Sequence, residues 1–520
     1  MVTRKSFIIV ISTFGIYILG MIGMVVLAKL WGEESVAALG TIGFAISTAS
    51  IFSIFSTFGF SVAHVKRISE GNDLGTCIGT FITIQLCLIG VMLGAIFVWT
   101  SILNPSFTDA TTESVFTIAI IYVVFTNLKN IPLNTFTGLC QITKRQITLT
   151  FENVTKLPLM ILVALFATGV TISSVFQPLQ QFVSEHAVGS LAMVYVAGVA
   201  STFIVGMYLM RNYPIKRPRF TMLKSYFIFA VPLAFSSVLI ILSMHIDKVM
   251  IGYFWTSTEV GYYFVVQRIT SMLAIFPAAV GIVLFPTISR FFMNNEIESI
   301  RINVRLSERY ISMIMIPPVI FTIVFSSSLI EILLDSAYLP GVTALIILSI
   351  WILINGLSMP YTNLIVGMDK PKSQATIAIV ACLINIALNY LMVPKNGMLS
   401  SFGVSGPSGA ACATVISGVY LFVASRIVAF RLAKLNPWQS HTVRHILAGI
   451  VMGLSLYQMS SYISMHWLYL SAFAGVGLLI YISVLYVLKE FNKKDLDFYL
   501  DILHPKKMLI ELKGDFKNGT

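Results

Sequence analysis

The chain contains few charged residues. Asp, Glu, Lys and Arg make up only 11% of its 520 residues, compared with about 25% in an ordinary soluble domain. Apolar residues make up 57%, and the mean hydropathy is +0.88. A soluble protein of this composition could not cover its surface with polar groups. Soluble enzymes, secreted disulfide-rich domains and free nucleic-acid-binding proteins are therefore excluded.

Catalytic and metal-binding patterns are also missing from the sequence. The five cysteines (77, 87, 140, 382 and 412) lie in or beside apolar runs without paired or metal-ligand spacing, so we interpret them as free thiols. We find no Walker A sequence, no His-Glu-x-x-His pattern and no soluble segment large enough to hold a nucleotide. We therefore expect no cofactor, no metal and no catalytic residues. Transport is favoured over catalysis, because a membrane enzyme would need carboxylates that converge at one membrane face.

Long uncharged runs define the fold class. Residues 6–28, 187–210 and 310–330 contain no charged side chain, and about 18 apolar residues suffice to span a bilayer. The sequence predicts an all-α polytopic membrane protein with about fourteen transmembrane helices. Their expected limits are 6–30, 36–62, 76–99, 115–138, 150–174, 187–210, 225–253, 260–288, 309–333, 342–366, 374–394, 407–429, 446–463 and 467–488.

Lys and Arg residues predict the orientation in the cell membrane. Most of the 34 basic residues fall in alternate connections, including 211–224 and the C-terminal tail, whereas the intervening loops carry acids such as Glu33, Glu113 and Asp335. Cytoplasmic loops are enriched in Lys and Arg. Both termini are therefore expected to be cytoplasmic.

The basic connection after the sixth helix suggests two similar halves. We expect an N-terminal six-helix lobe (1–210), a basic cytoplasmic linker (211–224) and a C-terminal six-helix lobe (225–434). An extra helix pair (435–488) and a basic cytoplasmic tail (489–520) would follow. The first and seventh helices end similarly, with Leu30-Trp31 and Phe254-Trp255. This similarity between the two helix ends fits an internal repeat, although chance explains it about as well.

Five charged residues fall inside predicted helices, and they are the candidate functional residues. Each costs roughly 2.5–3.5 kcal/mol near the middle of a bilayer, so a core built only for packing would omit them. We expect these side chains to face a hydrated or internally paired interior. They are Lys129, Lys156, Asp247, Lys248 and Arg268.

Lys129 and Lys156 lie at equal depth on the fourth and fifth helices if the connecting turn is near residue 142 or 143. Two like charges would not pair with each other. Each needs Glu152, water, an anionic ligand, or an asparagine such as Asn127, Asn130 or Asn153. The alternative is that both lysines extend to the inner headgroups.

Asp247 and Arg268 are each about ten residues from the turn between helices seven and eight. Their equal depth and opposite charge predict an ion pair, which serves either transport or structure alone. Lys248 is expected to extend toward the outer headgroups. Glu308 and Arg309 are expected to be helix-boundary residues. Asn355, Asn363, Asn385 and Asn389 are expected to bond between helices.

Several segments resemble one family. Trp-Gly-Glu-Glu-Ser-Val-Ala-Ala-Leu-Gly at 31–40 resembles the first outside turn of polysaccharide-export flippases. Pro232 and His-Ile-Asp-Lys-Val-Met-Ile-Gly-Tyr-Phe at 245–254 resemble their seventh helix, and Glu-Val-Gly-Tyr-Tyr at 259–263 resembles the start of their eighth. The chain is thus similar to the Wzx-like branch of the multidrug/oligosaccharidyl-lipid/polysaccharide exporter superfamily.

This resemblance implies two pseudo-symmetric six-helix lobes around a central cavity. It implies a substrate in which a polyprenyl lipid, a phosphate or pyrophosphate and a glycan are joined. Basic residues on the first and eighth helices of related flippases correspond approximately to Lys29 and Arg268. Membrane lipid surrounds such a protein, and glycan polymerases or glycosyltransferases are candidate partners.

The predicted function is a flippase for lipid-linked oligosaccharides that works by alternating access. Lys29, Lys129, Lys156, Arg268, Asn127 and Asn130 are the predicted substrate-binding residues. Glu152, Asp247 and Lys248 are the predicted coupling or gating residues. The alternative is a cation-coupled multidrug antiporter of the same superfamily.

Overall fold

The computed structural model describes residues 2–102, 112–170, 176–435, 440–460 and 466–491, and every regular element within these ranges is a helix. The first half of the chain contains α1 (Val2–Trp31), α2 (Glu33–Ile51), α3 (Ile54–Thr57), α4 (Phe60–Ser69), α5 (Leu74–Ile102), α6 (Glu113–Leu128), α7 (Asn130–Gly138), α8 (Ile142–Ala167), α9 (Gln177–Glu185) and α10 (Ala187–Met210).

The second half contains α11 (Phe220–Phe254), α12 (Ser257–Leu273), α13 (Ile275–Met293), α14 (Ile297–Val324), α15 (Ser326–Leu333), η2 (Ser336–Gly341), α16 (Val342–Gly367), α17 (Pro371–Met392), η3 (Ser400–Phe402), α18 (Gly406–Ala433), α19 (Ser440–Ser460) and α20 (Trp467–Val487). Thirteen helical segments of the described residues are long and apolar enough to cross a membrane. Together with α19, the partner of α20, they confirm a helical membrane protein with about fourteen passes.

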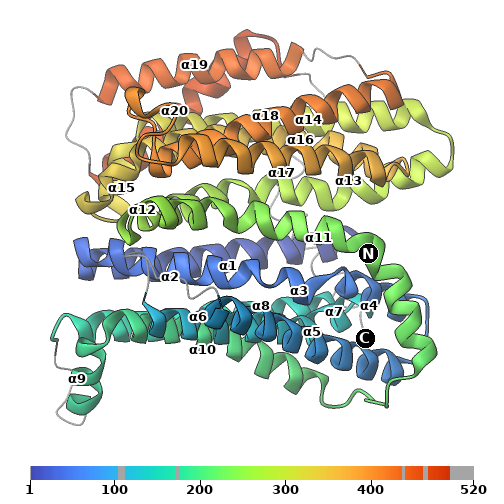
Figure 1. Ribbon diagram of the computed structural model, residues 1–520. Coiled ribbons are helices and arrows are strands. Elements are labelled where there is room, and N and C mark those ends of the chain that lie inside the picture. Colours follow the sequence, from blue (N-terminus) through green and yellow to red (C-terminus); the bar gives the residue numbers. More distant parts are fainter. Residues whose placement is uncertain (1, 103–111, 171–175, 436–439, 461–465, 492–520) are drawn as a thin grey trace.

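The helices form two lobes that lie side by side in Figure 1. In the first lobe, α8 packs against α1 and α10, and α6 packs against α2 and α10. In the second lobe, α16 packs against α13, α14 and α18, while α17 packs against α11 and α18. The pair α19–α20 covers α14, and α2 meets α12 between the lobes. We keep 1–210 and 225–434 as the proposed limits of these lobes.

The same tryptophan contact occurs in both lobes. Trp31, at the end of α1, donates from Nε1 to the carbonyl of Ala164 near the end of α8 at 3.0 Å. Trp255, after α11, donates from Nε1 to the carbonyl of Val393 after α17 at 2.7 Å. In each lobe, the tryptophan after the first spanning helix therefore holds the end of the fifth. This shared contact is what an internal repeat would produce.

Several helices differ from their predicted limits. The predicted helix 36–62 is divided into α2, α3 and α4, and the predicted helix 115–138 breaks at Lys129. The predicted helix 260–288 breaks at Ala274. The predicted helix 309–333 instead begins at Ile297, because its first three turns are amphipathic and carry the charges that had suggested a loop. The short helix α9 was not predicted.

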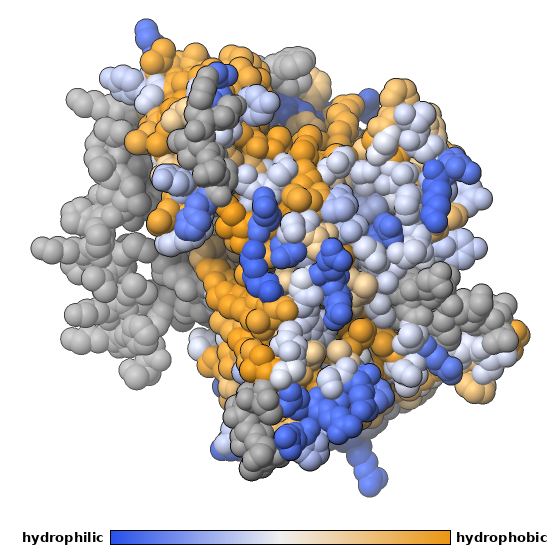
Figure 2. All heavy atoms as spheres, turned by 90° about the vertical axis from the view of Figure 1, so that its left-hand side faces the viewer, coloured by the Kyte–Doolittle hydropathy of each residue, from blue (hydrophilic) through white to orange (hydrophobic). Residues whose placement is uncertain are grey.

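The connections alternate between two ends of the bundle. The basic end carries the turns at 70–73, 139–141, 211–219, 294–296 and 368–370, at the right of Figure 1. The opposite, acidic end carries Gly32, α9 and the α11–α12 junction. Figure 2 shows the molecule from the acidic end, where hydrophilic residues (blue) lie among bands of apolar residues (orange).

Candidate functional site

A cavity of about 360 Å³ lies between the lobes. Its walls come from α1, α8 and α10 of the first lobe and from α12 of the second. Most of its polar lining is on α8, whose residues 145, 152 and 156 are spaced i, i+7 and i+11 and so share one face. The polar lining residues are Thr13, Tyr17, Arg145, Gln146, Glu152, Asn153, Lys156, Tyr195 and Arg268.

Glu152 is the acidic residue of this cavity, and Lys129 neutralises it. Lys129 lies where helix four breaks into α6 and α7, and its Nζ is 2.8 Å from Glu152 Oε2. Both side chains are largely buried. Of the partners that the sequence offered Lys129, the structure selects Glu152. It rules out extension of Lys129 to the headgroups.

Three other cations line the cavity without such a partner. In the described part of the chain, no carboxylate lies within ion-pair distance of Arg145, Lys156 or Arg268. The ammonium of Lys156 lies 5.0 Å from the centre of the Tyr195 ring. The guanidinium of Arg268 lies 5.6 Å from the centre of the Phe264 ring. Because the Lys129–Glu152 pair is neutral, the cavity is positively charged and suits an anion.

The predicted pair between Asp247 and Arg268 is wrong. Asp247 is buried and accepts hydrogen bonds from Tyr263 Oη at 2.6 Å, Asn389 Nδ2 at 2.8 Å and Thr414 Oγ1 at 2.9 Å. Arg268 instead lines the cavity. Equal depth in a hairpin does not fix the direction of a side chain around the helix axis. Residue 263 of α12 faces α11, whereas residue 268 faces the cavity.

Lys248 also differs from its prediction. It is 5% exposed and donates from Nζ to the carbonyl of Met244 at 2.9 Å and to Gln267 Oε1 at 2.8 Å. The expected extension to the outer headgroups is therefore wrong. Asn385 and Asn389 do bond between helices as expected, to Thr414 and Asp247 respectively. Among the described residues, the buried Nδ2 of Asn363 has no hydrogen-bond partner.

The remaining predicted binding residues lie outside the cavity lining. Lys29 lies at the acidic end, where its Nζ donates to the carbonyl of Glu331 in α15 at 2.8 Å. Asn127 is buried in the first lobe, where it accepts from Ser56 Oγ at 2.8 Å. Asn130, in the first turn of α7, does not line the cavity either. The structure thus brings Lys156, Arg268 and Glu152 together, with Lys129 behind Glu152.

Comparison with known proteins gives the family. A family model described as "Polysaccharide biosynthesis protein" matches residues 2–292, more than half of the chain. The chain belongs to this family. A second model, MatE, matches residues 232–391 of this polysaccharide biosynthesis family member.

Two curated relatives have similar sequences. A probable low-salt glycan biosynthesis flippase, Agl15, of Haloferax volcanii is 24% identical over 57% of this chain and 61% of its own length. A protein assigned as an O-antigen transporter of Shigella flexneri is 24% identical over 42% of this chain and 53% of its own length. The matches thus span about half to three fifths of these relatives.

Solved structures share the fold. The lipid II flippase MurJ in an inward closed conformation aligns with a TM-score of 0.69 at 16% identity, over 92% of this chain and 98% of that one. An inward-facing multidrug resistance MATE transporter aligns with a TM-score of 0.58 at 15% identity, over 81% and 96%. At 15–16% identity, these similarities show only that the chain shares the fold of the two transporters.

Sequence reasoning missed Arg145 and the aromatic lining residues. Arg145 was counted as a loop residue, but α8 begins at Ile142, so Arg145 lies in its first turn. The available signal was its i, i+7 and i+11 spacing with Glu152 and Lys156. Tyr17 and Tyr195 gave no such signal, because aromatic residues are common throughout the chain.

A second polar cluster in this family member joins the second lobe to the C-terminal helix pair. Glu308 accepts from Tyr361 Oη, from Arg426 Nη1 at 3.1 Å and from Thr442 Oγ1 at 3.4 Å. It is 1% exposed and Arg309 is 7% exposed, so the prediction that they are helix-boundary residues is wrong. They lie three turns inside α14, because that helix begins at Ile297.

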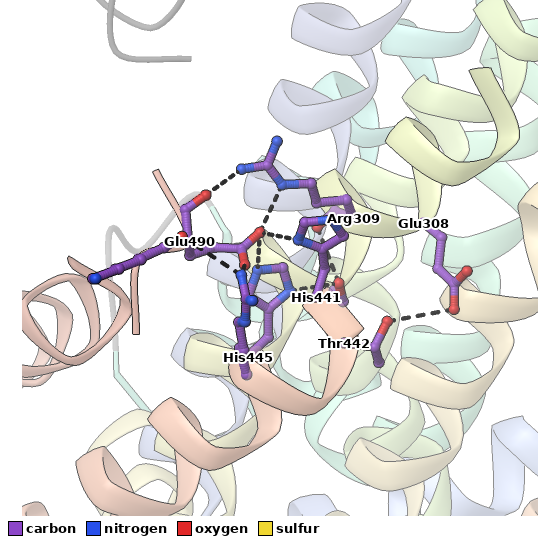
Figure 3. Close-up of polar contacts among 9 residues, drawn as sticks. Glu308, Arg309, His441, Thr442, His445 and Glu490 are labelled. Atoms are coloured by element: carbon purple, nitrogen blue, oxygen red, sulfur yellow. Dashed lines mark hydrogen bonds and ion pairs between the residues drawn. The ribbon is translucent and has the colours of Figure 1, made fainter. Parts of the chain in front are cut away.

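Glu490, just after α20, completes this cluster (Figure 3). Its carboxylate accepts from Arg309 Nε at 2.7 Å and Arg444 Nη1 at 3.1 Å, and lies 2.7 Å from His441 Nδ1. His445 Nε2 is 3.4 Å away. Burial alone would raise the pKa of Glu490, but contacts with His445, Arg309 and His441 lower it to about 2. The carboxylate therefore fixes the helix pair to α14.

Proposed function

We propose that this protein is a flippase that moves polyprenyl-(pyro)phosphate-linked oligosaccharides across the cell membrane for glycan assembly. The positive cavity between the lobes carries the proposal. Leaving cations unpaired within a bilayer costs roughly 2.5–3.5 kcal/mol each, and a phosphate between them would offset that cost. The similar proteins include a glycan biosynthesis flippase and a lipid II flippase, which supports a lipid-linked substrate.

Lys156 and Arg268 come from opposite lobes, so a phosphate between them would contact both lobes at once. Arg145, one turn from the start of α8, would meet the anion first from the basic end. Lys129 acts as a positioning residue, because it compensates the charge of Glu152. The glycan would occupy the cavity while the prenyl chain remains in lipid.

We further propose that the basic end is cytoplasmic, as the distribution of Lys and Arg favours. The substrate would then enter from the side on which glycans are joined to their lipid carrier. Glycosyltransferases and a glycan polymerase are the proposed partners, because they would supply and consume this substrate. Asp247 is the proposed coupling residue, since it is a carboxylate buried among uncharged donors.

A cation-coupled multidrug antiporter is the alternative, and the MatE match and the likeness to MATE transporters favour it. The charge of the cavity argues against it. A site for cationic drugs needs an exposed carboxylate, whereas Lys129 neutralises Glu152. The two functions therefore require cavities of opposite charge.

The first prediction tests the cavity cations. We expect Lys156→Gln and Arg268→Gln each to weaken binding of a fluorescent prenyl-pyrophosphate sugar about ten- to hundredfold, because each removes a charge-assisted contact of roughly 1.5–3 kcal/mol. Binding and flipping would be measured in proteoliposomes. Lys156→Arg should restore part of the activity, because it keeps the charge.

Arg211→Gln is the matched control, since Arg211 is exposed at the basic end and stacks on Tyr208 at 4.2 Å. It should remain within about twofold of wild type, as expected for a surface charge. Normal binding by both cavity variants would refute the anion site. Transport of a cationic dye without transport of the lipid-linked sugar would favour the antiporter.

A further inference from the structure

Glu152 and Lys156 bring opposite charges to the cavity between the lobes (the inter-lobe cavity). They are four residues apart on α8 and both line the cavity, so they lie one turn apart on one face of the helix. A glutamate four residues before a lysine is the favourable order for an ion pair within a helix. Glu152 instead pairs with Lys129 at 2.8 Å, and Lys129 is not part of the cavity lining. Glu152 is thus held by the cation that lies outside the cavity.

Arg268 offers Glu152 a third cation, from the opposite lobe. The charges of Lys129, Lys156 and Arg268 all act on the carboxylate of Glu152. In the described part of the chain, only Lys129 lies within ion-pair distance of it. Glu152 and a phosphate are both anions, so they would compete for Lys156 and Arg268.

The backbone of α10 holds the turn of α8 that carries Glu152 and Lys156. A Cβ atom built on Gly198 would lie 3.0 Å from the Glu152 carbonyl oxygen and 3.4 Å from Lys156 Cβ. The two helices therefore already touch at this turn, and α8 has no room to move toward α10. A change of partner must come from rotation of the Glu152 side chain or from movement of Lys129.

Lys129 lies at a junction where its helix is able to bend. It is the last capping residue of α6 and the first of α7. Its N–H donates to the carbonyl of Phe125 at 2.9 Å, and its own carbonyl accepts from the N–H of Leu133 at 3.3 Å. A change in the angle between α6 and α7 would move Lys129 relative to α8. The pair with Glu152 could then break without unfolding of either helix.

Phosphate binding and the Lys129–Glu152 pair would support each other. A phosphate between Lys156 and Arg268 would occupy both cavity cations and repel the carboxylate toward Lys129. By linkage, the pair would favour phosphate binding by the same factor. Once the pair breaks, the carboxylate would be drawn to Lys156 or Arg268 and would weaken their hold on the phosphate.

We infer that Glu152 is an internal competitor that releases the substrate phosphate. It pairs with Lys129 while the phosphate is bound, and it exchanges to Lys156 or Arg268 as the substrate leaves at the acidic end. This inference rests on the proposed function, in which the phosphate belongs to a lipid-linked substrate. Lys129 and Glu152 are positioning residues that set how many cavity cations the phosphate meets.

The sign of the change in affinity tests the competition. Lys129→Gln leaves Glu152 to pair with Lys156, so it should weaken binding of the fluorescent prenyl-pyrophosphate sugar about tenfold or more. Glu152→Gln should tighten binding, and the double variant Lys129→Gln/Glu152→Gln should bind at least as tightly as wild type. A double variant as weak as Lys129→Gln would overturn the competition, because Lys129 would then serve the phosphate directly.

Release separates an exchange of contacts from the long-range effect of charge. Glu152→Gln should lower both the KM and the kcat of flipping roughly threefold or more, because the phosphate binds tightly and leaves slowly. Glu152→Asp keeps the charge but is one methylene shorter, so it should also flip slowly while its affinity stays near that of wild type. If Glu152→Asp flips like wild type, charge without contact suffices and the exchange is overturned.

Stability measurements separate this role from a purely structural pair. Glu70→Gln is the matched control, because Glu70 pairs with Arg67 at 2.7 Å outside the cavity lining. It should keep KM and kcat within about twofold of wild type. Thermal unfolding of every variant would be measured in detergent. If Lys129→Gln and Glu152→Gln lower stability without opposite changes in affinity, the pair is structural and the inference is overturned.

Inorganic pyrophosphate distinguishes this inference from the proposed function. Its affinity should be highest for Glu152→Gln, intermediate for wild type and lowest for Lys129→Gln, because the competition concerns the anion alone. If pyrophosphate follows this order but the wild type neither binds nor flips the lipid-linked sugar, the flippase function fails and the competition stands. Failure of the wild type to bind either probe would overturn both.

Discussion

Glu490 is the residue through which the C-terminal helix pair is fixed to the second lobe. Its pKa is lowered to about 2 from a usual value of 4.5, so the folded state binds this proton more weakly than the unfolded state. The resulting stabilisation is fully present above pH 4.5 and is lost as the pH falls toward 2. We expect α19 and α20 to detach within that acidic window, as measured by the pH dependence of thermal unfolding in detergent.

The matching substitution is Glu490→Gln. It leaves the buried Arg309 without its countercharge, so it should lower the free energy of unfolding by about 3 kcal/mol at pH 7 and remove the acidic transition. Glu298→Gln is the control, because Glu298 forms its 2.8 Å pair with Arg301 while 69% exposed. The control should change stability by less than about 1 kcal/mol. Equal effects would contradict the role of Glu490.

At this scale, sequence predicted which residues matter better than it predicted their partners. The rarity of charge within apolar helices identified Lys156, Arg268 and Asp247, since burial in lipid makes each costly. The depth of a side chain in the membrane could be predicted by counting residues from the hairpin turn. The direction in which the side chain points around the helix axis could not. Asp247 and Arg268 were therefore paired wrongly. Glu490 lies in the segment predicted as the tail. Its contact with Arg309 of α14 depends on tertiary packing, which no local sequence pattern indicates.

Helices α2 and α12 contact each other at the acidic end. A Cβ atom built on Gly40 would lie 1.7 Å from the Ser257 carbonyl oxygen, and one on Gly261 would lie 2.0 Å from that of Val36. Only glycine permits this approach of two backbones. The two lobes therefore meet backbone to backbone at the acidic end.

We therefore expect Gly40→Ala to open the acidic end. A cysteine at Val36, which is 2% exposed, should react at least tenfold faster with an impermeant thiol reagent in this background. Gly90→Ala is the control, because a Cβ at Gly90 would meet no atom within 4 Å. An unchanged rate in Gly40→Ala would show that this contact does not close the acidic end.

Helices themselves were predicted well where apolar runs are long, as for α5 and α10, because the cost of burying polar backbone in lipid dictates the answer. Breaks within helices were not predicted. The interruption at Lys129 matters for the site, since it lies where this side chain reaches Glu152. Nothing in the local pattern of residues 115–138 distinguishes a broken helix from a continuous one.

For the whole molecule, the orientation can be tested by labelling intact cells. A cysteine at Ser336, exposed at the acidic end, should react with an impermeant reagent from outside, whereas one at Lys370 should be protected until the membrane is permeabilised. The reason is the excess of basic residues at the end that carries Lys370. The reverse labelling pattern would place the substrate entrance on the outer side.

The tryptophan contacts give one residue-by-residue correspondence between the two proposed halves. Lys156 lies eight residues before Ala164, which accepts from Trp31, and Asn385 lies eight residues before Val393, which accepts from Trp255. At this shared position, the first half carries a cation beside the inter-lobe cavity. The second half carries an amide that belongs to the hydrogen-bond network of the buried carboxylate Asp247. Such a difference in charge at one equivalent position is what duplication followed by divergence would produce.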